Sequence, residues 1–165
     1  MEVVSLGEEL RKKSALADDR ARSIKRFMLE GRILPSEWTM EVLKECVKDA
    51  LSKCDLVVID GFPRNESNWR AWKDAAGLEE LPVAGVVLLE CDQTTMLERI
   101  MERGANRPDD NVETVRKRID GFYNDTMPIV LLMRETLPVV CIDGGRDKEI
   151  VHMDVMAWLG RIERK

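Results

Sequence analysis

The feature that most constrains the fold is a short apolar run that stops abruptly in charged and turn-forming residues. Residues 56–59 are mostly β-branched, and Asp60-Gly61-Phe62-Pro63-Arg64 follows directly. Such a run is typical of a buried strand in a parallel sheet, and ligands bind beyond the carboxyl ends of such strands. The pattern predicts a site in which Asp60 suits a hydrated metal ion and Arg64 suits a phosphate or carboxylate. The simpler alternative is an ordinary polar turn.

Alternation of apolar runs with helical patterns predicts an α/β fold with a parallel sheet flanked by helices, in one domain over residues 1–165. Further strands are expected at residues 84–91 and 138–143, and Val3-Val4 is expected to end another. The predicted N-caps are Ser5 with Glu8 in a capping box, Ser36, Asp92 and Asn111. A long helix from residue 111 to about 135 is expected to bend at Pro128.

Helical spacing also predicts which side chains face the core. Trp69 and Trp72 are expected to pack inside rather than to stack on a ligand. The other predicted core faces are Met40, Leu43, Val47 and Leu51; Met96, Leu97, Ile100 and Met101; and Ile150, Val151, Val155, Trp158, Leu159 and Ile162. His152, the single histidine, is expected to serve no chemistry.

Composition excludes several classes of protein. The chain is 44% hydrophobic and 35% charged, which is typical of a globular protein, and its net charge of −5 argues against a nucleic-acid partner. No apolar run approaches the length of about 18 residues that a membrane span needs. The four cysteines form no CxxC pair, so we expect reduced thiols and a cytoplasmic location, with the nucleus also compatible.

The segment Asp60-Gly61-Phe62-Pro63-Arg64-Asn65, continuing to Asn68, resembles the nucleoside-monophosphate kinases, and its continuation is more similar to the UMP-CMP kinase branch. The resemblance runs from about Val4 to the C-terminus. It implies that Arg11 and Arg64 bind the acceptor phosphate and that Asn68 reads a pyrimidine base. It also implies acceptor contacts from Ile33 and Gly61, within an acceptor-binding part at about residues 7–36. Asp60 is expected to order Mg²⁺ through water, with no direct metal ligand.

A second resemblance lies in the arginine-rich segment from Arg99 to Arg118, whose pattern is similar to the lid of the same family. It implies that Arg99 stacks on the donor adenine, near Gly145 and Arg146. It implies that the transferred phosphoryl group is surrounded by Arg103, Arg107 and Arg118, and that a short lid spans about residues 104–111. Positioned arginines stabilise the negative charge of a phosphoryl-transfer transition state.

One departure from the family is large: none of the ten glycines belongs to a Gly-x-x-Gly-x-Gly-Lys phosphate-binding loop. The family carries that loop after its first strand, which is central in a sheet ordered 2-3-1-4-5. We therefore expect a P-loop kinase-like fold that lacks the central strand and has two unpaired inward edges. Three accounts fit this departure: a truncated sequence, an inert relative, or a unit supplied by another chain; the intact lid arginines favour truncation.

The expected function is transfer of the γ-phosphoryl group of ATP, with Mg²⁺, to a nucleoside monophosphate. CMP or UMP is favoured and AMP is possible, and the chain is expected to be a monomer if complete. Without the loop, its own activity is doubtful. The alternative is a non-catalytic nucleotide-binding or interaction protein derived from the same family.

Overall fold

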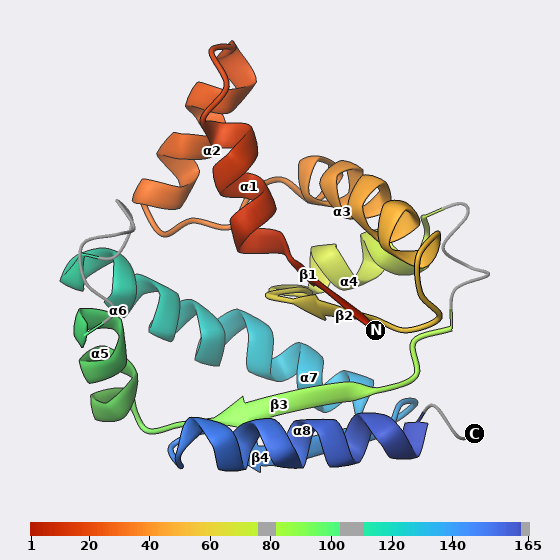
Figure 1. Ribbon diagram of the computed structural model, residues 1–165. Helices are drawn as coiled ribbons and strands as arrows, with labels where there is room; N and C mark the ends of the chain where they lie inside the picture. The colour runs from red at the N-terminus through yellow and green to blue at the C-terminus, as the bar shows by residue number, and fades with distance from the viewer. Residues whose placement is uncertain (76–81, 103–110, 163–165) are drawn as a thin grey trace.

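The computed structural model describes residues 1–75, 82–102 and 111–162, and within them the strands form two separate parallel sheets (Figure 1). Strand β1 (Glu2–Ser5) pairs with β2 (Val57–Asp60), and β3 (Val86–Glu90) pairs with β4 (Val139–Asp143). No ladder joins the two pairs within the described ranges. The predicted α/β class is confirmed, and so is the expected interruption of the sheet.

Helices connect the strands as the alternating pattern predicts, because parallel neighbours need crossover connections. Those of the first half are α1 (Leu6–Ser14), α2 (Asp19–Leu29), α3 (Ser36–Leu51) and α4 (Glu66–Lys73). Those of the second half are α5 (Gln93–Glu102), α6 (Val112–Gly121), α7 (Met127–Met133) and α8 (Lys148–Ile162). A π-helical turn, η1 (Phe122–Thr126), joins α6 to α7, and it lies just before Pro128, where the sequence predicts a bend.

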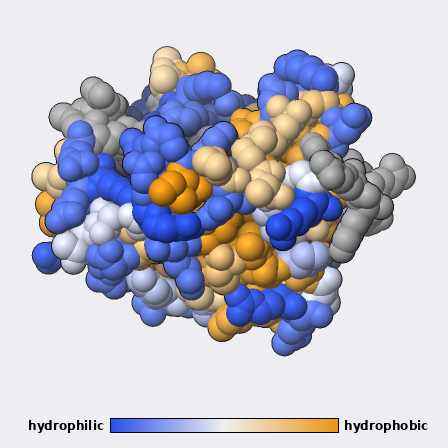
Figure 2. Space-filling model, turned by 60° about the horizontal axis from the view of Figure 1, so that its bottom comes forward, coloured by the Kyte–Doolittle hydropathy of each residue, from blue (hydrophilic) through white to orange (hydrophobic). Residues whose placement is uncertain are grey.

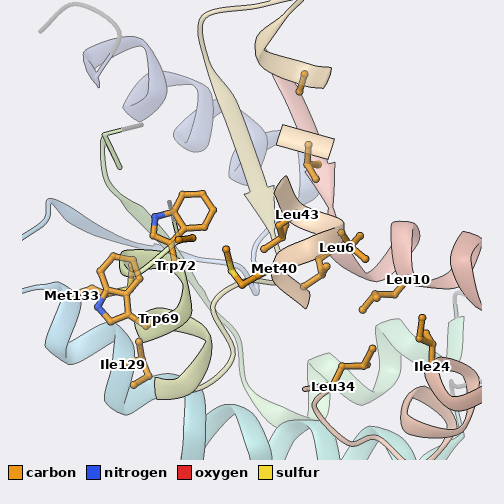
Figure 3. Close-up of a cluster of buried hydrophobic side chains, with 14 residues drawn as sticks. Leu6, Leu10, Ile24, Leu34, Met40, Leu43, Trp69, Trp72, Ile129 and Met133 are labelled. Atoms are coloured by element: carbon orange, nitrogen blue, oxygen red, sulfur yellow. The ribbon is translucent and has the colours of Figure 1, made fainter. Parts of the chain in front are cut away.

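The main hydrophobic core lies between the β1–β2 sheet and its helices, and α7 reaches into it from the second half (Figure 3). Trp69 and Trp72 of α4 are buried there with Ile129 and Met133 of α7, so the prediction that both tryptophans pack inside is confirmed. Leu43 of α3 is fully buried. This packing makes α7 one of the elements that join the two halves, together with α6, whose Thr114 hydroxyl donates to the Leu29 carbonyl.

One predicted N-cap residue is wrong, and one predicted capping box does not form, because the serine hydroxyl groups make tertiary hydrogen bonds. Ser5 is the N-cap residue of α1, as predicted, but its side chain makes no cap hydrogen bond and donates to the Asp60 carboxylate instead. The N-cap of α3 is Pro35, and the Ser36 hydroxyl bonds to Ser67 and Asn68 of α4.

The other two predicted caps are confirmed. The Asn111 side chain accepts from the amide of Thr114, and the Asp92 side chain accepts from the amide of Thr95.

Burial in the second half is lower than periodicity predicts. Helix α5 has no buried residue, and α8 buries only Leu159, whereas Met101 and Ile150 are largely exposed. The strands expected to be buried are mainly half-buried in β2, and Leu89 of β3 is 50% exposed. The physical reason is that β2 and β3 each pair with only one strand among the described residues, so one edge of each strand is left without a described neighbour to bury its side chains.

Within the described ranges, no helix combines the length and the apolar character that crossing a membrane requires.

Candidate functional site

The carboxyl ends of both strand pairs carry polar side chains, as expected for a ligand site of a parallel sheet. In the first pair Ser5 lies opposite Asp60, and the Ser5 Oγ donates to Asp60 Oδ2 over 3.0 Å. In the second pair Glu90 lies opposite Asp143. Asp60 is exposed, so its carboxylate is open to water and to a hydrated cation.

The turn after β2 holds Arg64 through Gly61. Gly61 has a φ of 80°, a left-handed conformation that favours glycine. A Cβ at this position would lie 3.2 Å from the Nη2 of Arg64, whose Nε donates to the Gly61 carbonyl over 3.0 Å. The peptide bond between Phe62 and Pro63 is cis. The turn thus folds the guanidinium back over its own glycine, at the carboxyl end of β2.

The main chain of Arg64 is bonded on both sides. Its N–H donates to Oδ1 of Asn68 over 3.2 Å, and its carbonyl accepts from Oγ1 of Thr126 over 2.8 Å. Asn68 is 1% exposed, and its Nδ2 donates to the Ser36 hydroxyl over 2.9 Å. The residue predicted to read a pyrimidine base is therefore buried and engaged with its own protein in this structure.

The other predicted acceptor residues lie in the first half of the chain. Arg11 is on α1 and forms an ion pair with Glu8 at 2.8 Å, with its side chain 23% exposed. Ile33 is half-buried in the segment between α2 and α3. Arg11 and Arg64 thus follow the neighbouring strands β1 and β2, which end side by side.

A second group of predicted residues comes together where α5 meets the loop between β4 and α8. The Arg99 guanidinium donates to the carbonyls of Gly144, Gly145 and Arg146, the last two over 2.9 Å each. The loop is held further by the Gly144 amide, which donates to the Glu90 carbonyl over 2.6 Å. Arg99, expected to stack on adenine, thus holds the loop expected to lie beside that base.

A hollow of about 500 Å³ opens beside this loop, between the ends of β3 and β4 and the π-helical turn. Its walls include Gly145, Asp143, Asp92, Phe122 and Tyr123. Hydrogen bonds from the hydroxyl and amide of Thr95 lower the pKa of Asp92 below its ordinary value, so this carboxylate is ionised at neutral pH. Aromatic rings with carboxylates suit a nucleoside base better than a phosphate chain.

The remaining predicted catalytic residues are only partly placed. Arg118 is half-buried on α6. Arg103 and Arg107, and all of the expected lid except Asn111, lie outside the described residues. Within the described ranges no cluster of His, Cys, Asp or Glu could hold a metal ion directly.

Sequence reasoning missed the contacts of Thr126 and Ser36 with this site. Thr126 lies 62 residues from Arg64, and helical periodicity gives no sign of a contact between them. The only available signal was the stretch Thr126-Met127-Pro128-Ile129, which resembles a segment of the kinase family but implies no role for its hydroxyl.

Comparison with known proteins agrees with this arrangement. The family model described as adenylate kinase matches residues 1–136. UMP-CMP kinase of Rattus norvegicus is 32% identical, covering 93% of this chain and 81% of the relative. UMP-CMP kinase 1 of Oryza sativa subsp. japonica is 28% identical over 98% of this chain, and Probable UMP-CMP kinase 1 of Arabidopsis thaliana is 36% identical over 76%. The matches cover only 65% and 59% of the length of these two plant relatives.

Parallel strand pairs flanked by helices, with charged groups beyond the strand ends, define an α/β protein with a candidate ligand site at the carboxyl edge of its strands. The chain belongs to the adenylate kinase family, and its similar relatives include UMP-CMP kinases.

Proposed function

We propose that this chain is the acceptor-binding and lid-bearing part of a phosphotransferase that moves the γ-phosphoryl group of ATP to CMP or UMP, with AMP as a further acceptor. The observation that carries the proposal is the placement of Asp60 and Arg64 at the carboxyl end of β2, in a chain that aligns with UMP-CMP kinases over 93% of its length. The expected setting is the cytoplasm, with the nucleus compatible, and the expected state is a monomer.

On the acceptor side, Arg11 and Arg64 would bind the phosphate, because guanidinium groups match its geometry with paired hydrogen bonds. Ile33 and Gly61 would lie along the nucleoside, with Asn68 beneath the turn. The exposed Asp60 and the Ser5 hydroxyl suit the water shell of Mg²⁺, which keeps several waters when it binds. The metal ion would neutralise phosphate charge, and no general base is needed because a phosphate oxygen is already a nucleophile.

On the donor side, the hollow beside Gly145 would take the base of ATP, with Arg146 and Arg99 at its loop. Arg118, together with Arg103 and Arg107, would surround the phosphoryl group in transfer. Their positive charge would stabilise the negative charge of the transition state, and one such arginine can raise the rate by about three to five powers of ten.

The sequence contains no glycine-rich phosphate loop, so the β- and γ-phosphates of ATP lack the amides and the lysine that usually hold them. Positioning supplies most of the catalysis of phosphoryl transfer. We therefore expect the chain, tested by itself, to bind monophosphates but to turn over at or near background. The same feature supports the second candidate function, a nucleotide-binding or interaction protein without catalysis.

Titration calorimetry with CMP, UMP, AMP and GMP, followed by a coupled assay with ATP and Mg²⁺, tests the proposal. We expect CMP and UMP to bind more tightly than GMP, and we expect turnover to appear when a strand, phosphate loop and helix from a UMP-CMP kinase are fused before Met1. Binding without turnover in that fusion would favour the non-catalytic protein. Absence of binding to all four monophosphates would refute both.

A further inference from the structure

The turn that carries Arg64 follows the last residue of β2, and the Arg64 side chain is exposed, with its Nε bonded to the Gly61 carbonyl. Both polar groups of the Arg64 main chain are also bonded to side chains from other elements. Asn68 of α4 accepts from the N–H, and Thr126 of η1 donates to the carbonyl. A main chain bonded on both sides loses most of its freedom before any ligand arrives.

Thr126 is placed for this contact by an irregularity of its helix. A threonine within a regular helix usually bonds to a carbonyl of its own preceding turn. Thr126 instead ends the π-helical turn between α6 and α7, and its hydroxyl reaches the Arg64 carbonyl at 2.8 Å. π-Helical turns are rare and occur often at functional sites, because the extra residue redirects side chains.

Asn68 holds the other side with an amide whose orientation is fixed. Its Oδ1 faces the Arg64 N–H, and its Nδ2 donates to the Ser36 hydroxyl, which is also bonded to Ser67 at 2.7 Å. The Asn68 side chain is 1% exposed, and it contacts the Arg64 main chain directly through its hydrogen bond with the N–H.

We propose that Thr126 and Asn68 form a two-sided clamp on the Arg64 main chain, and that both are positioning residues for the phosphate-binding guanidinium. The role in phosphate binding rests on the proposed function, whereas the clamp itself does not. Because Thr126 lies at the junction of α6 and α7, the clamp also joins the acceptor turn to the second half of the molecule. A pre-ordered turn increases affinity by lowering the entropy lost on binding.

The test compares Thr126→Val, which removes the hydroxyl at nearly constant volume, with Thr126→Ser, which keeps it. The matched control is Thr136→Val, because the hydrogen bond that the Thr136 hydroxyl makes among the described residues is local, to the Met133 carbonyl at 3.5 Å. Two quantities are measured: the hydrogen-exchange rate of the Arg64 amide by NMR, and the dissociation constant of CMP by calorimetry. Melting curves show whether each variant is folded.

We expect Thr126→Val to speed exchange of the Arg64 amide and to weaken CMP binding, each by about fivefold, the effect of one hydrogen bond. Thr126→Ser should restore both, and Thr136→Val should change neither. Exchange at the wild-type rate in Thr126→Val, or an equal loss in Thr126→Ser, would overturn the clamp. If the wild type binds no monophosphate, the proposed function is refuted. The exchange rate of the Arg64 amide still shows whether Thr126 orders the Arg64 main chain.

Asn68→Ala separates positioning from base reading. If Asn68 acts only by positioning Arg64, Asn68→Ala should raise the dissociation constants of CMP and GMP by the same factor. A loss confined to CMP and UMP would assign Asn68 to the base and contradict its place in the clamp. Should this variant fail to fold, the Thr126 pair still tests the proposal.

Discussion

Arg64 presents an exposed guanidinium at the carboxyl end of β2, on a turn bonded to two other elements. If it binds the acceptor phosphate, Arg64→Ala should weaken CMP, UMP, AMP and GMP alike, because the phosphate is common to all four. Hydrogen bonds to charged groups contribute about 1.5–3 kcal/mol, so the expected loss is about ten- to a hundredfold in the dissociation constant measured by calorimetry.

The matched control is Arg70→Ala, since Arg70 is an exposed arginine of the neighbouring helix α4 that pairs with Glu66. It should leave all four affinities unchanged. A loss limited to one base in Arg64→Ala would show that the guanidinium does not hold the phosphate.

At the residue scale, the sequence predicted backbone turns correctly. It did not predict the hydrogen-bond partners of side-chain hydroxyl groups, because several partners were possible for each. The turn at Gly61 was predictable, and its φ of 80° needs glycine. The side chains of Ser5 and Ser36 were expected to cap helices, but their hydroxyl groups form hydrogen bonds with Asp60 and Asn68 instead. Local sequence can show that a cap is possible, but it cannot show that a group distant in the chain bonds to the same oxygen.

Among the elements, α8 packs against the β3–β4 sheet, and Gly85 and Gly160 test that packing in opposite directions. A Cβ at Gly85, just before β3, would lie 2.8 Å from the Pro138 carbonyl oxygen and 2.8 Å from the Trp158 ring of α8. Gly85→Ala should therefore destabilise the protein by about 1–3 kcal/mol, as overpacking does. A Cβ at Gly160, inside α8, would meet nothing within 4 Å.

Gly160→Ala should instead stabilise the protein by about 0.5–1 kcal/mol, because alanine loses less conformational freedom in a helix. Urea denaturation of both variants and the wild type measures the difference. Equal stability of the two variants would mean that α8 does not pack on Gly85 as the structure has it.

Element identity was predictable over most of the described chain, whereas the degree of burial of each helix face was not. The apolar runs and cap residues correctly located β2, β3 and β4 and the helices between them. The expected core faces of α5 and α8 are mainly half-buried, with only Met101 and Ile150 exposed, since periodicity shows which residues share a face but not how completely another element covers it. In α3 the same reasoning worked for Met40, Leu43 and Val47, because α1, α4 and β1 surround that helix.

For the molecule as a whole, the main feature is a pair of two-stranded sheets, each with edges that pair with no described strand. An apolar patch accompanies these edges: Figure 2 shows hydrophobic residues gathered across the middle of one face, with hydrophilic residues around them. Exposed side chains of the second half include Leu89, Leu131, Ile150 and Met153. Open strand edges and exposed apolar side chains favour association between molecules.

A fused segment of strand, phosphate loop and helix before Met1 should therefore raise the melting temperature and reduce binding of a hydrophobic dye. The physical reason is that a parallel strand would satisfy main-chain groups at the inner edges of β2 and β3 while its helix covers apolar surface.

The control is the same fusion with prolines in the middle of the added strand, since proline cannot donate to a ladder. Equal melting temperatures for the two fusions would show that the added strand does not enter the sheet. The division of the sheet itself could be expected only through the family resemblance, because alternation of strands and helices does not give the order of strands.

The division into two sheets also affects how the chain folds. Ser5 and Asp60 are 55 residues apart, and Val86 and Val139, which open the other pair, are separated by nearly the same length of chain. Each sheet therefore closes a long loop before any of its hydrogen bonds form, and the entropic cost of closure is similar for both. Such non-local pairing slows folding, and neither sheet provides a template for the other. The two strand pairs should behave as separate cooperative units, joined through the core that α7 shares with the tryptophans of α4 and through the hydrogen bonds of Thr126 and Thr114 to the first half.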